Sequence, residues 1–433
     1  MNIKLLHTRL FLSAVVMLVF FTGSVFAQSN GWVQQTSGTN VNLEDIQFID
    51  ANNGWAVGWD NTILKTTDGG QTWVTKRSIV KGPFIYGVYF WDANKGWAAE
   101  DNGSILSTTD GGETWSEKST SAPYLIDFDF VDANNGWAFG GLGAILHTTD
   151  GGTHWTSQNT KQGNDFYAGK FFNADTGVAV GYLGRCIRTT DGGNTWQQTS
   201  SYLAESFDDL SFINSTEGWA VGPLDTNTVI AHTTDGGQNW IKQKQLNGMN
   251  LDGIFFIDSQ NGWASGGATG INRIQHGVIL HTTDGGTSWE QSNFYFSNFY
   301  NLKAFSFIDA NTGWIVGDAG IILHTTNGGV ASVKEITGNA LPKQFVLRQN
   351  YPNPFNPSTT IEFSIPKQSF VTLKVYDLLG REIATLVNKE LMSGSYKTEF
   401  NASSAKSKLA SGIYLYRLNA DGNVQTKKLM LMK

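Results

Sequence analysis

The residues of this sequence best suited to chemistry are carboxylates in short turns. Five near-copies of an Asp-x-x-x-Gly turn, such as Asp50 to Gly54, carry the oxygen ligands that calcium prefers. An EF-type calcium loop, however, alternates its oxygens over about 12 positions and closes with a Glu, and these turns are too short for that pattern. Asx turns, in which the Asp side chain binds nearby backbone amides, explain them better. We therefore predict no metal site and no cofactor.

Paired acids could instead serve as the two carboxylates of a glycosidase. The pairs Glu100/Asp101 and Asp208/Asp209 fall in predicted loops, but adjacent residues of a strand point in opposite directions, so we expect solvated surface features. A sialidase would need an arginine triad and a tyrosine nucleophile. Residues 28–341 contain only four arginines, Arg77, Arg185, Arg188 and Arg273. We predict no catalytic residues, and a glycoside hydrolase or lyase is the alternative hypothesis.

The acidic turns belong to a repeat of about 40 residues, the size of a propeller blade. Each unit accommodates four short strands. It contains two recurring elements, a segment like Phe48 to Gly58, which includes the first acidic turn, and a second turn motif that follows it. The sequence therefore predicts an all-β fold, a seven-bladed β-propeller. The turn motif, Thr-Thr-Asp-Gly-Gly-Gln-Thr-Trp in the first unit, recurs with its aspartate at Asp68, Asp110, Asp150, Asp191, Asp235 and Asp284, and with Asn327 in a seventh copy.

The seventh copy lacks its outer strand, because Val330-Ala331-Ser332 follows the turn where a Trp is expected. The segment from Trp32 to Ser37 closely matches the outer strand that begins at Trp196. We predict that this N-terminal strand completes the last blade, closes the ring and removes the exposed edges of an open sheet. The predicted propeller spans residues 28–333.

The eight-residue turn motif resembles the Asp-box, or BNR, repeat. Its combination with Gly-Trp-Ala-Val-Gly at Gly54 to Gly58 resembles the photosystem II assembly and stability factor family of propellers, from residue 31 to about residue 330. The Asp-box resemblance implies a structural role, in which the Asp and Thr bind amides of their own turn and the Trp packs between sheets. The family resemblance implies assembly or chaperone work.

The connections between repeats vary in length and are aromatic. Because strand direction alternates, they share the rim opposite to the repeated turns, and variable loops on a rigid scaffold are common binding sites. Tyr, Trp and Arg are favoured anchors there, although they could simply cap the blade ends. The predicted ligand-binding residues are Trp59, Tyr86, Tyr124, Tyr167, Tyr182, Arg185, Tyr202, Arg273, Tyr295 and Tyr300.

Residues 1–27 read as a cleavable signal peptide. Lys4 and Arg9 precede an apolar run from Leu10 to Phe21, and small residues end at Ala27. The run is short for a membrane anchor. The lone cysteine, Cys186, excludes an intramolecular disulfide and is expected to be buried and inert.

The C-terminal part predicts a small Ig-like β-sandwich. Five of the eight prolines fall between Pro342 and Pro366, which marks a linker over residues 334–349 before a domain over residues 350–433. Tyr-Pro-Asn-Pro-Phe-Asn-Pro from Tyr351, the Gly412-Ile413-Tyr414 strand and the lysine-rich end resemble the type A sorting domain of the type IX secretion system. This resemblance implies passage through the periplasm and then secretion or outer-surface attachment, with the secretion machinery and its sortase as partners.

Charge separates the two domains. Residues 28–341 contain 15 Lys and Arg against 31 Asp and Glu, whereas residues 342–433 contain 13 against 6. The acidic propeller argues against a nucleic-acid partner, which needs a basic face. We expect membrane contact only through surface attachment after sorting. The favoured hypothesis is a non-catalytic surface or secreted module that binds a protein or glycan.

Overall fold

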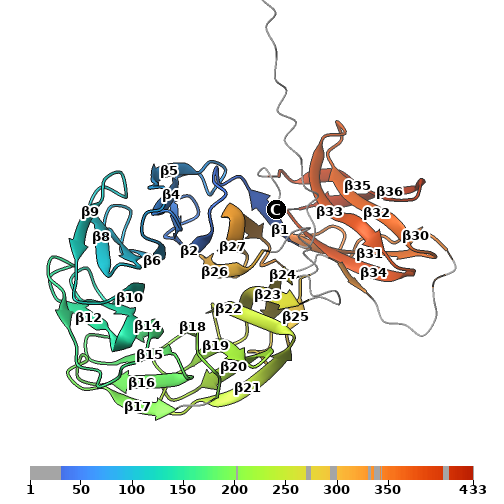
Figure 1. Cartoon of the computed structure of the whole chain (residues 1–433). Helices are drawn as coiled ribbons and strands as arrows, with labels where there is room; N and C mark the ends of the chain where they lie inside the picture. The colour runs from blue at the N-terminus through green and yellow to red at the C-terminus, as the bar shows by residue number, and fades with distance from the viewer. Residues whose placement is uncertain are drawn as a thin grey trace, which may run out of the picture.

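The computed structural model describes residues 31–200, 203–269, 275–292, 300–329, 333–335, 342, 344–402 and 409–432. Its strands form seven four-stranded antiparallel sheets arranged as the blades of a ring, and two further four-stranded sheets in the C-terminal part (Figure 1). The predicted all-β fold is confirmed. Among these residues no helix is both long and apolar enough to cross a membrane.

The blades follow one another along the chain, and each runs from an inner to an outer strand. The first three contain β2 (Leu43–Phe48), β3 (Gly54–Gly58), β4 (Thr62–Thr66) and β5 (Val74–Arg77); β6 (Ile85–Phe90), β7 (Gly96–Glu100), β8 (Ser104–Thr108) and β9 (Ser116–Ser119); and β10 (Leu125–Phe130), β11 (Gly136–Gly140), β12 (Ile145–Thr148) and β13 (Thr156–Ser157). The next two contain β14 (Phe166–Phe171), β15 (Gly177–Gly181), β16 (Arg185–Thr189) and β17 (Gln197–Ser200); and β18 (Asp209–Phe212), β19 (Gly218–Leu224), β20 (Asn227–Thr233) and β21 (Ile241–Asn247). The last two contain β22 (Met249–Phe256), β23 (Gly262–Thr269), β24 (Gln275–Thr282) and β25 (Glu290–Gln291); and β26 (Leu302–Phe307), β27 (Thr312–Gly317), β28 (Ile322–Thr326) and β1 (Trp32–Gln35), with short 3-10 turns η1 (Gly141–Gly143) and η2 (Asp318–Gly320).

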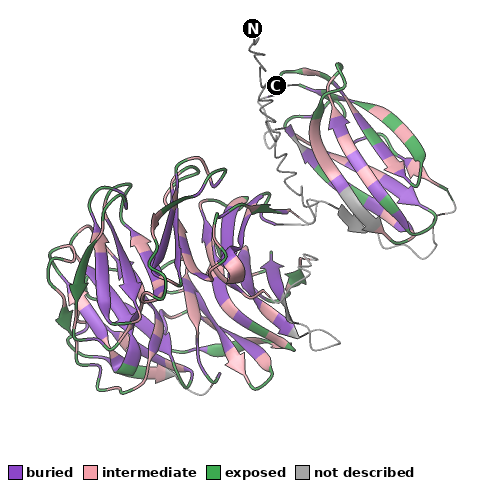
Figure 2. Ribbon diagram, turned by 45° about the horizontal axis from the view of Figure 1, so that its top comes forward, coloured by how far each residue is buried: buried purple, intermediate pink, exposed green. Residues whose placement is uncertain are grey.

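Aromatic residues of the repeat hold neighbouring blades together. Trp55 on β3 stacks on Phe90 of the next blade at a centroid distance of 3.5 Å, and Phe90 meets the Asp-box Trp115 edge to face. The same stack recurs between Trp97 and Phe130, Trp137 and Phe171, Trp219 and Phe256, Trp263 and Phe307, and Trp314 and Phe48. Buried residues therefore run along the three inner strands of each blade, whereas exposed ones gather in the turns and on outer strands such as β9 (Figure 2).

The N-terminal strand β1 is the outer strand of the seventh blade. It pairs antiparallel with β28, and Trp32 lies opposite Thr325. Trp32 is fully buried and meets Phe307 edge to face at 6.0 Å, which is the geometry of the Asp-box Trp in other blades. The two ends of the propeller chain thus share one sheet.

Side-chain hydrogen bonds stabilise the repeated turns. In the first Asp-box, Asp68 Oδ1 accepts hydrogen bonds from the Thr72 amide and the Thr66 hydroxyl, at 2.9 and 2.8 Å. Asp50 likewise accepts from the amides of Asn52 and Asn53, as an Asx turn requires. Both carboxylates serve their own turn.

The C-terminal part is a sandwich of two sheets ordered β29-β34-β31-β30 and β33-β32-β35-β36. A shared apolar core, including Ile361, Val371 and Leu418, lies between them. The strands are β29 (Val333–Glu335), β30 (Val346–Leu347), β31 (Ser358–Ile365), β32 (Ser369–Tyr376), β33 (Glu382–Leu391), β34 (Gly394–Asn401), β35 (Gly412–Ala420) and β36 (Asn423–Leu431).

The predicted linker over residues 334–349 is wrong in part. β29 pairs with β34 and β30 pairs with β31, so both segments are edge strands of the sandwich. Their backbone amides and carbonyls find partners on the sheet edges, a requirement that proline content alone does not reveal. The Tyr416 hydroxyl on β35 also holds the end of this segment against the sandwich. It donates a hydrogen bond to the Arg348 carbonyl and accepts one from the Asn350 amide.

Candidate ligand-binding cavity

A β-bulge near the start of the inner strands re-aims one side chain per blade. In the first blade the pairing register shifts between Leu43 and Asp45, so Glu44 is the extra residue, and equivalent shifts occur in five other blades. Bulges are frequent beside binding sites because they redirect a side chain. The residues four places before the final Phe of each inner strand, which we call the mouth residues, are Glu44, Tyr86, Ile126, Tyr167, Asp208, Asp252 and Lys303.

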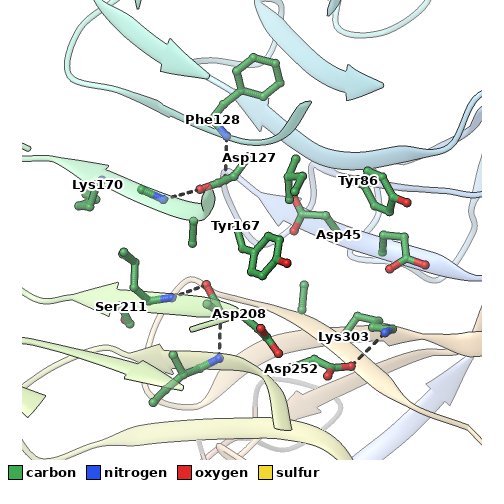
Figure 3. A pocket seen from close by; sticks show the side chains of 18 of the residues that line it. Asp45, Tyr86, Asp127, Phe128, Tyr167, Lys170, Asp208, Ser211, Asp252 and Lys303 are labelled. Atoms are coloured by element: carbon green, nitrogen blue, oxygen red, sulfur yellow. Dashed lines mark hydrogen bonds and ion pairs between the residues drawn. The ribbon is translucent and has the colours of Figure 1, made fainter. Parts of the chain in front are cut away.

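All seven mouth residues line one cavity at the centre of the ring. Its volume is about 990 Å³, enough to enclose a side chain or a small ligand. Tyr86, Tyr167, Asp208 and Lys303 point toward the same space in Figure 3, although they come from four different blades. The cavity is therefore a property of the ring and of no single repeat.

The cavity is strongly acidic. Eight carboxylates and two lysines line it, and both lysines already have acidic partners. Lys303 Nζ lies 3.0 Å from Asp252, and Lys170 Nζ lies 2.7 Å from Asp129. The carboxylates are Glu44, Asp45, Asp101, Asp127, Asp165, Asp208, Asp209 and Asp252. The cavity thus has more acidic than basic side chains, which favours a cationic ligand, and burial raises the pKa of several of these acids.

Three of these carboxylates connect neighbouring blades. Asp45, Asp127 and Asp209 occupy the same place in alternate blades, and each accepts a hydrogen bond from an inner-strand amide of the next blade at 2.8 to 3.0 Å. Burial raises the pKa of Asp45 to about 6 and that of Asp209 to about 7, against the opposing effect of these hydrogen bonds. The corresponding position of the second blade is Gly87, where there is no room for a carboxylate side chain. A Cβ there would lie 2.2 Å from the Ile126 carbonyl oxygen.

Three of the predicted rim tyrosines line the cavity, namely Tyr86, Tyr124 and Tyr167. Burial raises the pKa of all three hydroxyls, to about 12 for Tyr167, and nearby Asp165 adds to the shift for Tyr124 and Tyr167. The rings are therefore neutral hydrogen-bond donors with a π face, set among carboxylates.

The other predicted rim residues lie elsewhere. Trp59 stacks on Phe84 at 4.6 Å and donates to Glu44 at 2.6 Å, so it supports the cavity without lining it. Tyr182, Arg185 and Tyr300 do not line it, and the Arg185 guanidinium donates to the Gln162 side chain. Tyr202, Arg273 and Tyr295 lie outside the described residues.

The interpretation of the acidic pairs as solvated surface is wrong. Glu100 is fully buried and accepts a hydrogen bond from Asn61, and Asp101 lines the cavity. Asp208 and Asp209 both line it, because the Asp208 amide bonds to the Val221 carbonyl while Asp209 also pairs with Val221. Two residues, Asp208 and Asp209, therefore lie opposite the single residue Val221. At this point the side chains of the strand do not alternate between its two faces, as the sequence argument had assumed.

Sequence reasoning missed the ring of mouth residues, including Glu44, Asp252 and Lys303. Alignment of the seven repeats on their final Phe would have shown that the position four residues earlier varies between blades, with five residue types among the seven, beside turn positions that scarcely vary. Among the described residues, no group of three or more His, Cys, Asp or Glu could hold a metal ion.

Comparison with known proteins gives the family of this fold. The family model described as photosynthesis system II assembly factor YCF48 matches residues 25–84, 79–162, 161–251 and 242–347. The chain belongs to this YCF48 family. The resemblance seen in the repeats is therefore confirmed, and the family match spans the propeller described above.

Individual relatives agree with the family assignment. The photosystem II assembly protein Ycf48 of Thermosynechococcus vestitus is 43% identical over 44 residues, which is 10% of this chain and 13% of that protein. The solved structure "YCF48 bound to D1 peptide" is 23% identical with a TM-score of 0.56, covering 70% of this chain and 98% of that one. YCF48 from Cyanidioschyzon merolae is 20% identical with a TM-score of 0.55, over 68% and 98%. These structures share the propeller fold.

The C-terminal sandwich has its own match. A model described as secretion system C-terminal sorting domain covers residues 349–432. The chain is therefore a YCF48-family propeller with a type IX sorting domain, directed to secretion or to the cell surface and recognised by the type IX machinery.

Proposed function

We propose that this protein is an exported, non-catalytic binding protein that holds a protein or glycan ligand at the mouth of its central cavity. The observation that carries the proposal is the ring of mouth residues, in which seven blades contribute seven side chains to one acidic, tyrosine-bearing cavity. A rigid scaffold whose repeats each present a varied side chain to one cavity is well suited to specific recognition.

A protein ligand is favoured over a glycan. One structural relative was solved as "YCF48 bound to D1 peptide", so a propeller of this fold binds a peptide. The sorting domain directs the present chain to the outer surface, and its ligand would therefore be an extracellular or surface polypeptide. We further propose cleavage after Ala27, a periplasmic intermediate and removal of residues 350–433 by the sortase.

Probing peptide and glycan arrays with the purified protein tests the site. We expect Tyr86→Ala and Tyr167→Ala each to weaken binding about tenfold or more, because anchors in a cavity carry much of the affinity. The control is Asp150→Asn, which changes a repeated turn on the other rim. Binding that survives both tyrosine changes in folded protein, or is lost in the control, would contradict this site.

Hydrolysis or elimination of a polysaccharide is the second candidate. It is favoured by Asp208, a cavity carboxyl whose pKa burial raises to about 6 while the Ser206 hydroxyl opposes the shift. Such a group can act as a general acid near neutral pH. Polysaccharide cleavage by the wild type, lost in Asp208→Asn, would make this the correct function.

A further inference from the structure

Apolar residues are exposed beside the acidic cavity. The tips of the turns after β11 and β15 carry Leu142, Tyr182 and Leu183, which are 67%, 47% and 38% exposed. We call these three residues the apolar tips. Exposed apolar residues that gather at one place mark surfaces that bind other molecules.

The apolar tips adjoin the cavity through Asp165, which lines it. The Leu142 amide donates to Asp165 Oδ1 at 2.8 Å, and the Tyr182 amide donates to the Asp165 carbonyl at 3.0 Å. Tyr124 lies on the same side, since its carbonyl accepts from the Gly141 amide at 3.1 Å. The apolar tips and the cavity mouth therefore form one continuous surface over the third and fourth blades.

The turns do not themselves require leucine. Leu142 and Leu183 have φ values of 54° and 59°, in the left-handed region, where a leucine costs about 1 kcal/mol or more. The corresponding turn of the first blade places Asp60 and Asn61 there, residue types that tolerate this conformation. Burial cannot explain the leucines either, since both are exposed.

The chemistry of this surface points to one class of partner. We propose that it docks a polypeptide that inserts a lysine or arginine side chain into the cavity while neighbouring apolar side chains cover the tips, an inference that rests on the proposed binding function. The excess of carboxylates over lysines complements the charge of the inserted group. Tyr86, Tyr124 and Tyr167 can add cation–π contacts. A glycan would supply neither the charge nor the apolar neighbours.

Short synthetic peptides with a central arginine between leucines test this proposal on the purified full-length protein. Matched peptides carry citrulline, which keeps the shape without the charge, or serines in place of the leucines. We expect each replacement to weaken binding at least about tenfold, and added salt to weaken only the arginine peptides. The blocked amino acid N-acetylarginine methylamide should bind far more weakly than the peptide.

Variants of the protein locate the contacts. Leu142→Asn and Leu183→Asn suit the left-handed turn, so the fold persists, and they should weaken binding of the leucine peptide but not that of its serine counterpart. Asp165→Asn keeps an acceptor for the Leu142 amide, and it should remove part of the preference for arginine over citrulline. Thermal unfolding verifies that each variant is folded.

The outcomes separate the two proposals. Equal binding of arginine and citrulline peptides, indifference to the leucine changes, or equal binding of the small arginine derivative would each overturn the docking proposal while the tyrosine-dependent site stands. Capture of glycans alone would overturn it as well. Binding that ignores Tyr86 and Tyr167 altogether would instead contradict the proposed function.

Discussion

At the scale of single residues, burial of acids makes the propeller sensitive to pH. The raised pKa of Asp209 means that the folded state holds its proton more tightly than the unfolded state does. The resulting stabilisation is complete below the unfolded pKa of about 4 and is lost as pH rises through about 7. Asp45 contributes in the same direction through about pH 6.

We expect Asp209→Asn to flatten this dependence, because an amide keeps the acceptor for the Ile254 amide and carries no charge. Urea unfolding measured from pH 5 to pH 8 checks it. The wild type should lose stability across this range by more than the variant does. Parallel curves for the two proteins would show that Asp209 does not titrate as its burial predicts.

The Asp-box aspartates are expected to behave differently, because they are partly or fully exposed and bind their own turns. Asp68→Asn removes the Oδ2 acceptor of the Thr72 hydroxyl, keeps the Oδ1 acceptor of the Thr72 amide, and should cost about 1 kcal/mol of stability. Ligand binding should be unchanged, since the cavity does not include this turn. Chemical unfolding and the array assay measure the two effects separately.

At the scale of elements, ring closure depends on one short strand. Trp32 is fully buried between the sheets of the last blades, whereas its neighbour Val33 is 40% exposed. We expect Trp32→Ala to cost about 3 to 5 kcal/mol, as large-to-small changes in cores do, and the matched change Val33→Ala to cost little. Unfolding midpoints decide the question, and similar losses for both variants would argue against a structural closure by β1.

At the scale of the whole molecule, folding and routing belong to separate domains. The first sandwich strand begins at Val333, so a chain that ends at Gly329 keeps every described propeller strand. We expect this truncated protein to fold but to stay inside the producing cell, because the sorting domain is missing. Fractionation with immunodetection measures its location, and the full-length protein is the control. Normal amounts of the truncated form outside the cell would contradict the assignment of routing to the C-terminal domain.

Much of the fold was predictable because the residues that determine the structure of each blade lie within one repeat. The glycine-rich turns, the buried Phe and Trp, and the missing Trp of the seventh copy act over a few residues, and they predict seven blades and the partner of Trp32 from local chemistry. The same reasoning predicted that Tyr86, Tyr124 and Tyr167 share one rim, and all three line the cavity. The sorting domain could also be predicted from the sequence, because each of its motifs is a contiguous segment.

The cavity was decided by the tertiary structure alone. Glu44, Asp208 and Lys303 lie far apart in the chain, and only closure of the ring brings them to one space. A bulge lies at the mouth residue in six of the blades, and strand alternation read from sequence gives the opposite answer for Asp208 and Asp209. Burial of these two acids in the cavity then raises their pKa and so determines their charge near neutral pH. Pairing of β29 and β30 with the sandwich is likewise a contact between distant segments, which local residue preferences do not encode.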